Sequence, residues 1–357
     1  MVETLSKADE VVRSLRRRIV LGEFRSGNVL PTRETLKRDF GVSNSTVQQA
    51  LSTLKDEGFI FSRQGSGSFV ADNLPHLTNY AIAFPCPRGD PDYWSRFSVA
   101  LLNEAAMLES RQTQYRLPIY HNVDRELGSP ERRALEDEVR NHRLAGVILA
   151  RRPFGLDGSS ILLDPMVRRV CYTSQISENL PAVFVDYQSF ANQALDELKR
   201  RGRTRIAIIS DARAITTTTD FLVNGLAERG MTTQPWWVHK TAAHPMDASR
   251  TLTHLLMRDN PADRPDGIVI TDDNLIEGVS AGLIAANIRV PTDVDVVAHA
   301  NFPLPSPTVL PVISLGFSAT EILETCLKVI DAQREGKDVP SLTLVPARFE
   351  EKLTASS

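Results

Sequence analysis

Apolar positions recur with a helical period three times near the start of the chain. The first pattern predicts a helix over about residues 6–22, and Thr32 and Ser43 are suitable N-caps for two further, shorter helices. Gly41 lies where the second of these must end. The apolar positions that share a face are Val11, Leu15 and Ile19 in the first helix and Val47, Ala50, Leu51 and Leu54 in the third.

A strand pattern follows these helices. Residues 59–62 and 68–70 are mostly apolar and flank the glycine-rich stretch 63–67, which predicts a two-stranded hairpin. Two helices joined by a short glycine-containing turn and followed by such a hairpin are typical of a winged helix-turn-helix domain. The third helix begins with polar side chains that suit base contacts in the major groove, although the same residues also suit a solvated helix cap.

This stretch resembles the DNA-binding domain of the GntR family of regulators. The likeness rests on residues 30–36 (LPTRETL), 40–43 (FGVS), 57–60 (EGFI) and 65–70 (GSGSFV), together with Thr46, Val47, Ala50, Leu51 and Leu54. The resemblance implies that duplex DNA is a partner. The residues that it assigns to DNA are Arg33, Ser43, Asn44, Ser45, Thr46, Gln48, Gln64 and Gly65.

Two of these residues depart from the family pattern. The family often has Arg where this chain has Asn44 and Gln48. Bidentate Arg contacts to guanine are then unavailable, whereas Asn and Gln suit adenine. We therefore expect an operator that depends less on G·C pairs at those steps.

From residue 80 onward, short apolar runs alternate with helical patterns. The runs are 80–84, 117–120, 146–150, 170–173, 182–185, 206–209, 235–238, 267–271, 294–298 and 312–315. The helical patterns are 93–110, 129–142, 188–201, 218–229, 247–259, 274–286 and 318–335. This alternation predicts an α/β fold with parallel sheets, and so many strands favour two lobes.

The region resembles the effector domain of the LacI/GalR family, which is related to periplasmic binding proteins. The likeness rests on residues 182–187 (AVFVDY), 201–209 (RGRTRIAII), 265–274 (PDGIVITDDN) and 290–301 (VPTDVDVVAHAN). A GntR-type DNA-binding domain joined to such an effector domain is also found in arabinose-responsive regulators. The expected organisation is a winged helix at 1–72, a linker at 73–79 and an effector-binding and dimerisation domain at 80–357. Its first lobe would comprise about 80–185 and 314–340, and its second about 186–313 and 341–353.

The resemblance implies that a small polar effector, sugar or sugar-like, binds in a cleft between the lobes, where the strands end. The candidate effector-binding residues are Arg88, Trp94, Arg151, Asp211, Asp273, His299 and Asn301. Asp273 suits sugar hydroxyls, but it or Asp272 equally suits a helix cap, and Trp94 equally suits packing at a helix start. The stretch 215–221 lacks the family's Arg, and Ala300 and Asn301 replace the family's usual acid. A different polar molecule, or an anion drawn by Arg88, Arg151 or Arg152, therefore stays open.

Composition adds little to this picture. Residues 1–75 carry 11 Lys and Arg against 9 Asp and Glu, and the remaining residues carry 30 against 35, which is a weak basic bias at the front. The three cysteines lack metal-site spacing and are expected to be buried thiols in a cytoplasmic protein without a membrane partner. We predict a homodimeric repressor without catalytic residues, metal or cofactor. The alternatives are a cytoplasmic ligand-binding protein or a cofactor-dependent enzyme fused to a helix-turn-helix.

Overall fold

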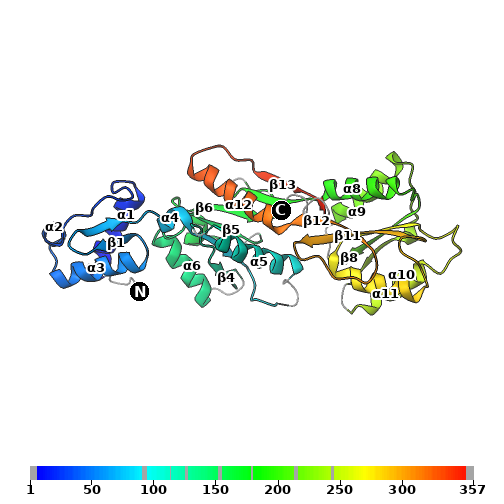
Figure 1. Cartoon of the computed structure of the whole chain (residues 1–357), viewed down its shortest axis with the longest axis horizontal. Helices are drawn as coiled ribbons and strands as arrows, with labels where there is room; N and C mark the ends of the chain where they lie inside the picture. The colour runs from blue at the N-terminus through cyan, green and yellow to red at the C-terminus, as the bar shows by residue number, and fades with distance from the viewer. Residues whose placement is uncertain are drawn as a thin grey trace. The chain divides into compact units, whose positions relative to one another are not determined.

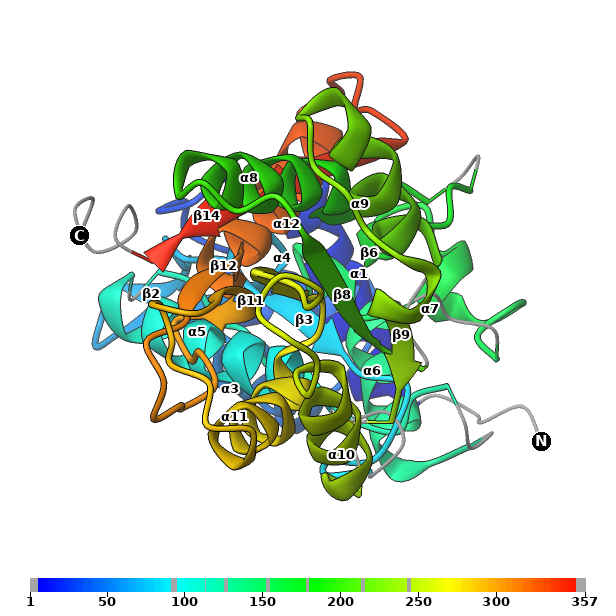
Figure 2. The same cartoon turned by 90° about the vertical axis from the view of Figure 1, so that its right-hand side faces the viewer.

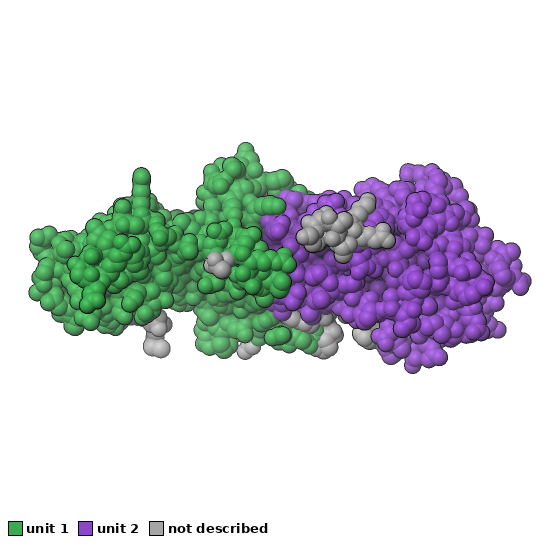
Figure 3. All heavy atoms as spheres, viewed as in Figure 1, with its two compact units in different colours: residues 1–94, 105–182, 326–342 green, residues 95–104, 183–325, 343–357 purple. Residues whose placement is uncertain are grey.

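The computed structural model describes residues 6–90, 95–112, 114–124, 128–151, 155–177, 180–212, 216–242 and 245–350. The chain divides into two compact units (Figure 3). Unit 1 comprises residues 1–94, 105–182 and 326–342, and unit 2 comprises 95–104, 183–325 and 343–357. Within the described residues, no helix is long and apolar enough to cross a membrane.

The N-terminal part of unit 1 is a three-helix winged domain (Figure 1). Its elements are α1 (Lys7–Val20), α2 (Arg33–Phe40), α3 (Asn44–Asp56), β1 (Ile60–Arg63) and β2 (Gly67–Val70). The hydroxyls of Thr32 and Ser43 accept the backbone N–H groups three residues ahead, and Gly41 adopts the left-handed conformation that ends α2. The predicted caps are thus confirmed. The predicted apolar stripes are also buried in one core.

One six-stranded sheet has the order β13-β7-β6-β5-β3-β4. The strands are β3 (Tyr80–Ala83), β4 (Ile119–Tyr120), β5 (Gly146–Leu149), β6 (Arg168–Tyr172), β7 (Ala182–Asp186) and β13 (Leu342–Pro346). The neighbours β4, β3, β5 and β6 pair in parallel, and β3 and β5 are buried throughout. Along the chain, these strands alternate with or follow the helices α4 (Pro75–Thr78), α5 (Arg96–Arg111), α6 (Pro130–Arg140), α7 (Ser160–Leu163) and α12 (Ala319–Arg334).

The other six-stranded sheet belongs to unit 2 and has the order β14-β12-β11-β10-β8-β9. Its strands are β8 (Ile206–Asp211), β9 (Val238–Thr241), β10 (Gly267–Ile270), β11 (Asp295–Phe302), β12 (Ile313–Ser318) and β14 (Arg348–Phe349). Figure 2 shows α8 (Tyr187–Arg200) and α9 (Thr216–Glu228) on one face, with α10 (Asp247–Leu256) and α11 (Ile276–Ala285) on the other. Alternate strand residues such as Ile209, Ile270 and Ala298 pack against α10 and α11.

The predicted α/β class with two largely parallel sheets is confirmed. The prediction of a strand at 235–238 was wrong for its first three residues. Pro235–Trp237 forms a 3-10 turn, and the strand begins at Val238. The pattern also missed β13 and the two-residue β14, and it missed the single-turn helices α4 and α7. The three cysteines are free and buried, as expected.

Candidate functional site

The predicted DNA-reading residues occupy three elements of the winged domain. Arg33 is the first residue of α2, Asn44 is the first residue of α3, and Gln64 and Gly65 form the turn between β1 and β2. All four are exposed. Within the described part of the chain, the Arg33 guanidinium has no acidic partner, so its charge is available to a phosphate.

The polar start of α3 divides into two sets. Ser43 Oγ lies 2.7 Å from Ser45 Oγ and 2.9 Å from Thr46 Oγ1, and it accepts the Thr46 N–H at 3.2 Å. These three hydroxyls therefore form the helix cap, which was one of the two interpretations left open. Asn44 and Gln48 lie one turn apart on the exposed surface, and no side-chain hydrogen bond occupies either within the described residues.

The sequence interpretation missed Arg63 at the base of the wing. Its guanidinium lies 5.2 Å from the Phe61 ring centre and 5.1 Å from the Phe69 ring centre. The two rings stack across the hairpin at 5.6 Å. Cation–π contacts hold the exposed charge beside Gln64. The available signal was that Arg63 is the only charged residue of the hairpin.

The predicted effector residues do not all fall in one place. Asp211, Asp273, His299 and Asn301 belong to unit 2, Arg88 and Arg151 are exposed residues of unit 1, and Trp94 lies outside the described residues. In unit 2, neighbouring strands β8, β10 and β11 are in register at Ile209, Ile270 and Ala298.

The four unit 2 residues all follow those registered positions. Asp211, Asp273, His299 and Asn301 therefore lie at the carboxyl edge of one sheet, where ligands of parallel α/β sheets bind. Asp211 and Asp273 are both buried there.

Asp272 and Asp273 have different roles. Asp272 Oδ1 accepts the Asn274 backbone N–H at 2.9 Å and so caps η2 (Asp273–Leu275). Asp273 is 3% exposed, and its Oδ2 accepts from Asn301 Nδ2 at 2.9 Å. Burial raises the pKa of Asp273, while nearby His299 and the bond from Asn301 oppose this rise.

The same edge holds unsatisfied buried polar atoms. Thr271 Oγ1 and His299 Nδ1 are buried without a hydrogen-bond partner in the described structure. The centre of the His299 ring lies 5.8 Å from the centre of the Phe190 ring and 5.6 Å from that of Phe317. A hollow of about 470 Å³ beside Asp273 is also lined by Arg96, Ser306 and Thr308 from unit 2. The lining of this hollow combines carboxylate, hydroxyl and guanidinium groups, which suit a polar ligand.

Comparison with known proteins adds two family matches. The family described as "Bacterial regulatory proteins, gntR family" matches residues 7–70, and the "Periplasmic binding protein-like domain" matches residues 195–352. The chain carries a GntR-type DNA-binding domain and a periplasmic binding protein-like domain. These are the two domain types that the sequence resembled.

Relatives of the GntR-type domain include proteins that are named as repressors. One is the mannosyl-D-glycerate transport/metabolism system repressor of Escherichia coli (strain K12), 40% identical over 73 residues, which are 20% of this chain and 29% of that protein. Another is the arabinose metabolism transcriptional repressor of Geobacillus stearothermophilus, 33% identical over 73 residues, which are 20% of each chain. The match thus spans less than a third of either relative.

Solved structures share the fold of the periplasmic binding protein-like domain. A LacI family transcriptional regulator from Arthrobacter sp. FB24 in complex with lactose has a TM-score of 0.57 at 18% identity, covering 76% of this chain and 97% of that one. A regulatory protein of the LacI family from Chloroflexus aggregans has a TM-score of 0.59 at 17% identity, covering 77% and 97%.

Within unit 1, charged side chains connect the GntR-type domain to the residues that follow it. Glu57, the C-cap of α3, accepts from Arg16 Nη2 of α1 at 2.7 and 2.5 Å and from Arg143 Nη1 at 2.8 Å. Arg16 Nη1 also donates to Asn141 Oδ1, the C-cap residue of α6, at 2.6 Å. The Arg16 side chain is 4% exposed, so its guanidinium is largely shielded from solvent.

Proposed function

We propose that the protein is a non-enzymatic transcriptional repressor that binds operator DNA as a homodimer and releases it when a small sugar-like molecule binds. The observation that carries the proposal is the exposed pair Asn44 and Gln48 at the start of α3, flanked in the same domain by the unpaired Arg33 and a glycine-tipped wing. Support comes from relatives of this domain that are named repressors.

The proposed roles in DNA binding differ between residues. Asn44 and Gln48 contact base edges. The hydroxyls of Ser43, Ser45 and Thr46 stabilise the start of α3 and face the DNA phosphate backbone. Arg33, with Gln64 and Gly65 of the wing, contacts phosphates. One such domain reads one half-site, so two copies of the chain read an operator whose half-sites are about one helical turn, or a multiple, apart.

The proposed effector site is the carboxyl edge of the unit 2 sheet. Asp273 accepts hydroxyl hydrogens, and Thr271 and His299 gain the hydrogen bonds that they lack. Asp211 and Asn301 complete the edge. The lactose complex of a LacI family regulator with this fold supports a sugar as the ligand class. We keep Arg88, Trp94 and Arg151 as further proposed contacts.

The test is selection of a preferred sequence from random duplex DNA by the purified whole chain, followed by titration with sugars. We expect enrichment of a two-fold symmetric site and weaker binding of that site when the effector is present. Linkage requires the operator to weaken effector binding by the same factor. A chain that enriches no sequence at modest ionic strength would refute the proposal.

A further inference from the structure

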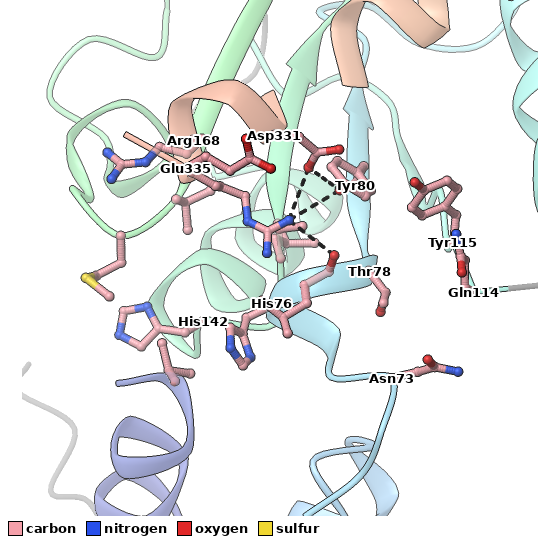
Figure 4. Close-up of a pocket in the computed structure, with 17 residues that line it drawn as sticks. Asn73, His76, Thr78, Tyr80, Gln114, Tyr115, His142, Arg168, Asp331 and Glu335 are labelled. Carbon is pink, nitrogen blue, oxygen red and sulfur yellow. Dashed lines mark hydrogen bonds and ion pairs between the residues drawn. The ribbon is translucent and has the colours of Figure 1, made fainter. Parts of the chain in front are cut away.

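A second hollow lies within unit 1, where the GntR-type domain meets the residues that follow it (Figure 4). Its volume is about 600 Å³, within the range of small-molecule sites. Val20 at the end of α1 forms one side. The segment containing His76 and Thr78 forms the next, and His142 and, from α12, Arg334 also line the hollow.

One wall of this hollow is fully paired. The Tyr80 hydroxyl donates to Asp331 Oδ1 at 2.6 Å, and Arg334 Nη1 donates to the same oxygen at 3.1 Å and to the Leu77 carbonyl at 3.3 Å. These contacts, drawn as dashed lines in Figure 4, give the site a rigid polar side without a net charge.

Another part of the lining contains buried ring nitrogens that lack hydrogen bonds. His76 Nδ1 and His142 Nδ1 are buried and have no hydrogen-bond partner in the described structure. Burial, with smaller contributions from Arg334 and His142, lowers the pKa of His76 to about 4. Burial likewise lowers the pKa of His142. Both rings are therefore neutral near pH 7, and a neutral imidazole that lines the hollow can donate or accept a hydrogen bond with a ligand hydroxyl.

A smaller hollow of about 220 Å³ adjoins the first and shares Val20, His142 and Met166 with it. Arg13 and Arg17 of α1 line this part, and both are exposed without an acidic partner in the described residues. The other two arginines of this lining are paired, Arg16 with Glu57 and Arg140 with Glu136. The mouth thus presents two uncompensated positive charges.

We propose that these adjoining hollows form one binding site for a phosphorylated monosaccharide. The phosphate lies between Arg13 and Arg17, and the sugar hydroxyls reach His76 and His142. The site is separate from the unit 2 sheet edge, where the buried carboxyl group of Asp273 disfavours a phosphate. A ligand at this site contacts both α1 of the GntR-type domain and the residues of unit 1 that follow this domain in the chain. If the proposed repressor function holds, the ligand is a second regulator of DNA binding.

The test is calorimetric titration of the DNA-free whole chain with a panel of hexose and pentose phosphates at about 0.1 M salt, where exposed charges still act over about 10 Å. We expect binding of at least one of them and none of the matching unphosphorylated sugar at this site. Arg13→Gln with Arg17→Gln should weaken binding at least about tenfold, because it removes both charged donors to the phosphate. The charge-matched control is Lys7→Gln with Arg25→Gln, two exposed residues that line neither hollow.

Two further variants locate the ligand. Met166 is exposed and lines both hollows, so Met166→Trp should block binding without removing a charge, and Asp273→Asn should leave binding unchanged. The inference is overturned if no sugar phosphate binds, if the Arg13/Arg17 variant binds as the control does, or if Asp273→Asn abolishes binding. Unchanged ligand binding with weaker DNA binding in the Arg13/Arg17 variant would instead assign these arginines to the DNA backbone. Because no DNA is present in the titration, failure of the repressor proposal leaves its result intact.

Discussion

The bridge at Glu57 predicts that one buried charge holds the GntR-type domain in its folded and docked state. In Glu57→Gln, Arg143 keeps its ion pairs with Asp137 and Glu138, but Arg16 keeps only uncharged partners. These are the oxygen of Asn141, the amide oxygen of the new side chain and the Phe59 ring, whose centre lies 5.7 Å from the guanidinium carbon. Arg16 then carries a nearly uncompensated charge at 4% exposure. The variant should therefore lose stability mainly through Arg16.

The magnitude follows from burial. Removing one partner of a buried ion pair costs about 3–5 kcal/mol, and we expect about 2–3 kcal/mol here because Gln keeps one acceptor oxygen. The matched control is Glu34→Gln, whose carboxylate lies 3.9 Å from Lys37 Nζ at 75% exposure. An exposed pair of this kind contributes less than about 0.5 kcal/mol.

Hydrogen exchange of the backbone amides measures this difference locally. A loss of 2–3 kcal/mol corresponds to about 30- to 150-fold faster exchange of the slowest amides of α1 and α3. Glu34→Gln should leave these rates within about threefold. Equal exchange in the two variants would show that the Glu57 bridge does not stabilise the domain.

Four further predictions concern the proposed sites. Asn44→Ala and, separately, Gln48→Ala should each cost about 1–3 kcal/mol at one base pair, and a loss spread over all substituted operators in a binding assay would refute direct reading. Arg33→Ala should weaken all sequences and reduce the salt slope of log K by about one, as measured by anisotropy. Arg63→Gln should act in the same way in this assay, and unchanged binding would show that the wing does not reach DNA. Effector affinity, measured by calorimetry, should fall as the pH decreases through the raised pKa of Asp273, because the protonated carboxyl group is a poorer acceptor. This fall should occur at a higher pH than an ordinary Asp would give, and Asp273→Asn should remove it.

The GntR-type domain was predictable because its signals are local. Thr32, Gly41 and Ser43 each determine a helix end through bonds within three or four residues, and the structure places all three as expected. The 235–238 run shows the opposite case. Aromatic residues favour a strand, but Pro235 has a fixed φ and no N–H, and it begins a tight turn instead. The strands β13 and β14 lacked such signals because pairing with distant strands defines them.

The two candidate small-molecule sites differ in the same way. Residues at the unit 2 sheet edge follow apolar runs, so their position at strand ends was enough to name Asp273 and Asn301 as candidates. The structure then shows that β10 and β11 are neighbours and that the two side chains are in contact. The hollow in unit 1 joins Arg13 and His76 to Arg334, and no period or motif connects positions so distant in the chain. Only tertiary packing reveals it.

Asn301, one of the two residues that depart from the LacI/GalR pattern at the end of this strand, has a defined contact in the structure. Asn301 Nδ2 donates to Asp273 Oδ2 at 2.9 Å, in a place where both residues are more than nine-tenths buried. A carboxylate at position 301 would bring two negative charges to that distance, which raises one pKa strongly and leaves one group protonated near neutral pH. The amide instead holds Asp273 as an oriented acceptor. In the sequence, the lack of an acid at this place weakened the sugar interpretation. In the structure, Asn301 instead favours a ligand that donates hydroxyl hydrogens to Asp273.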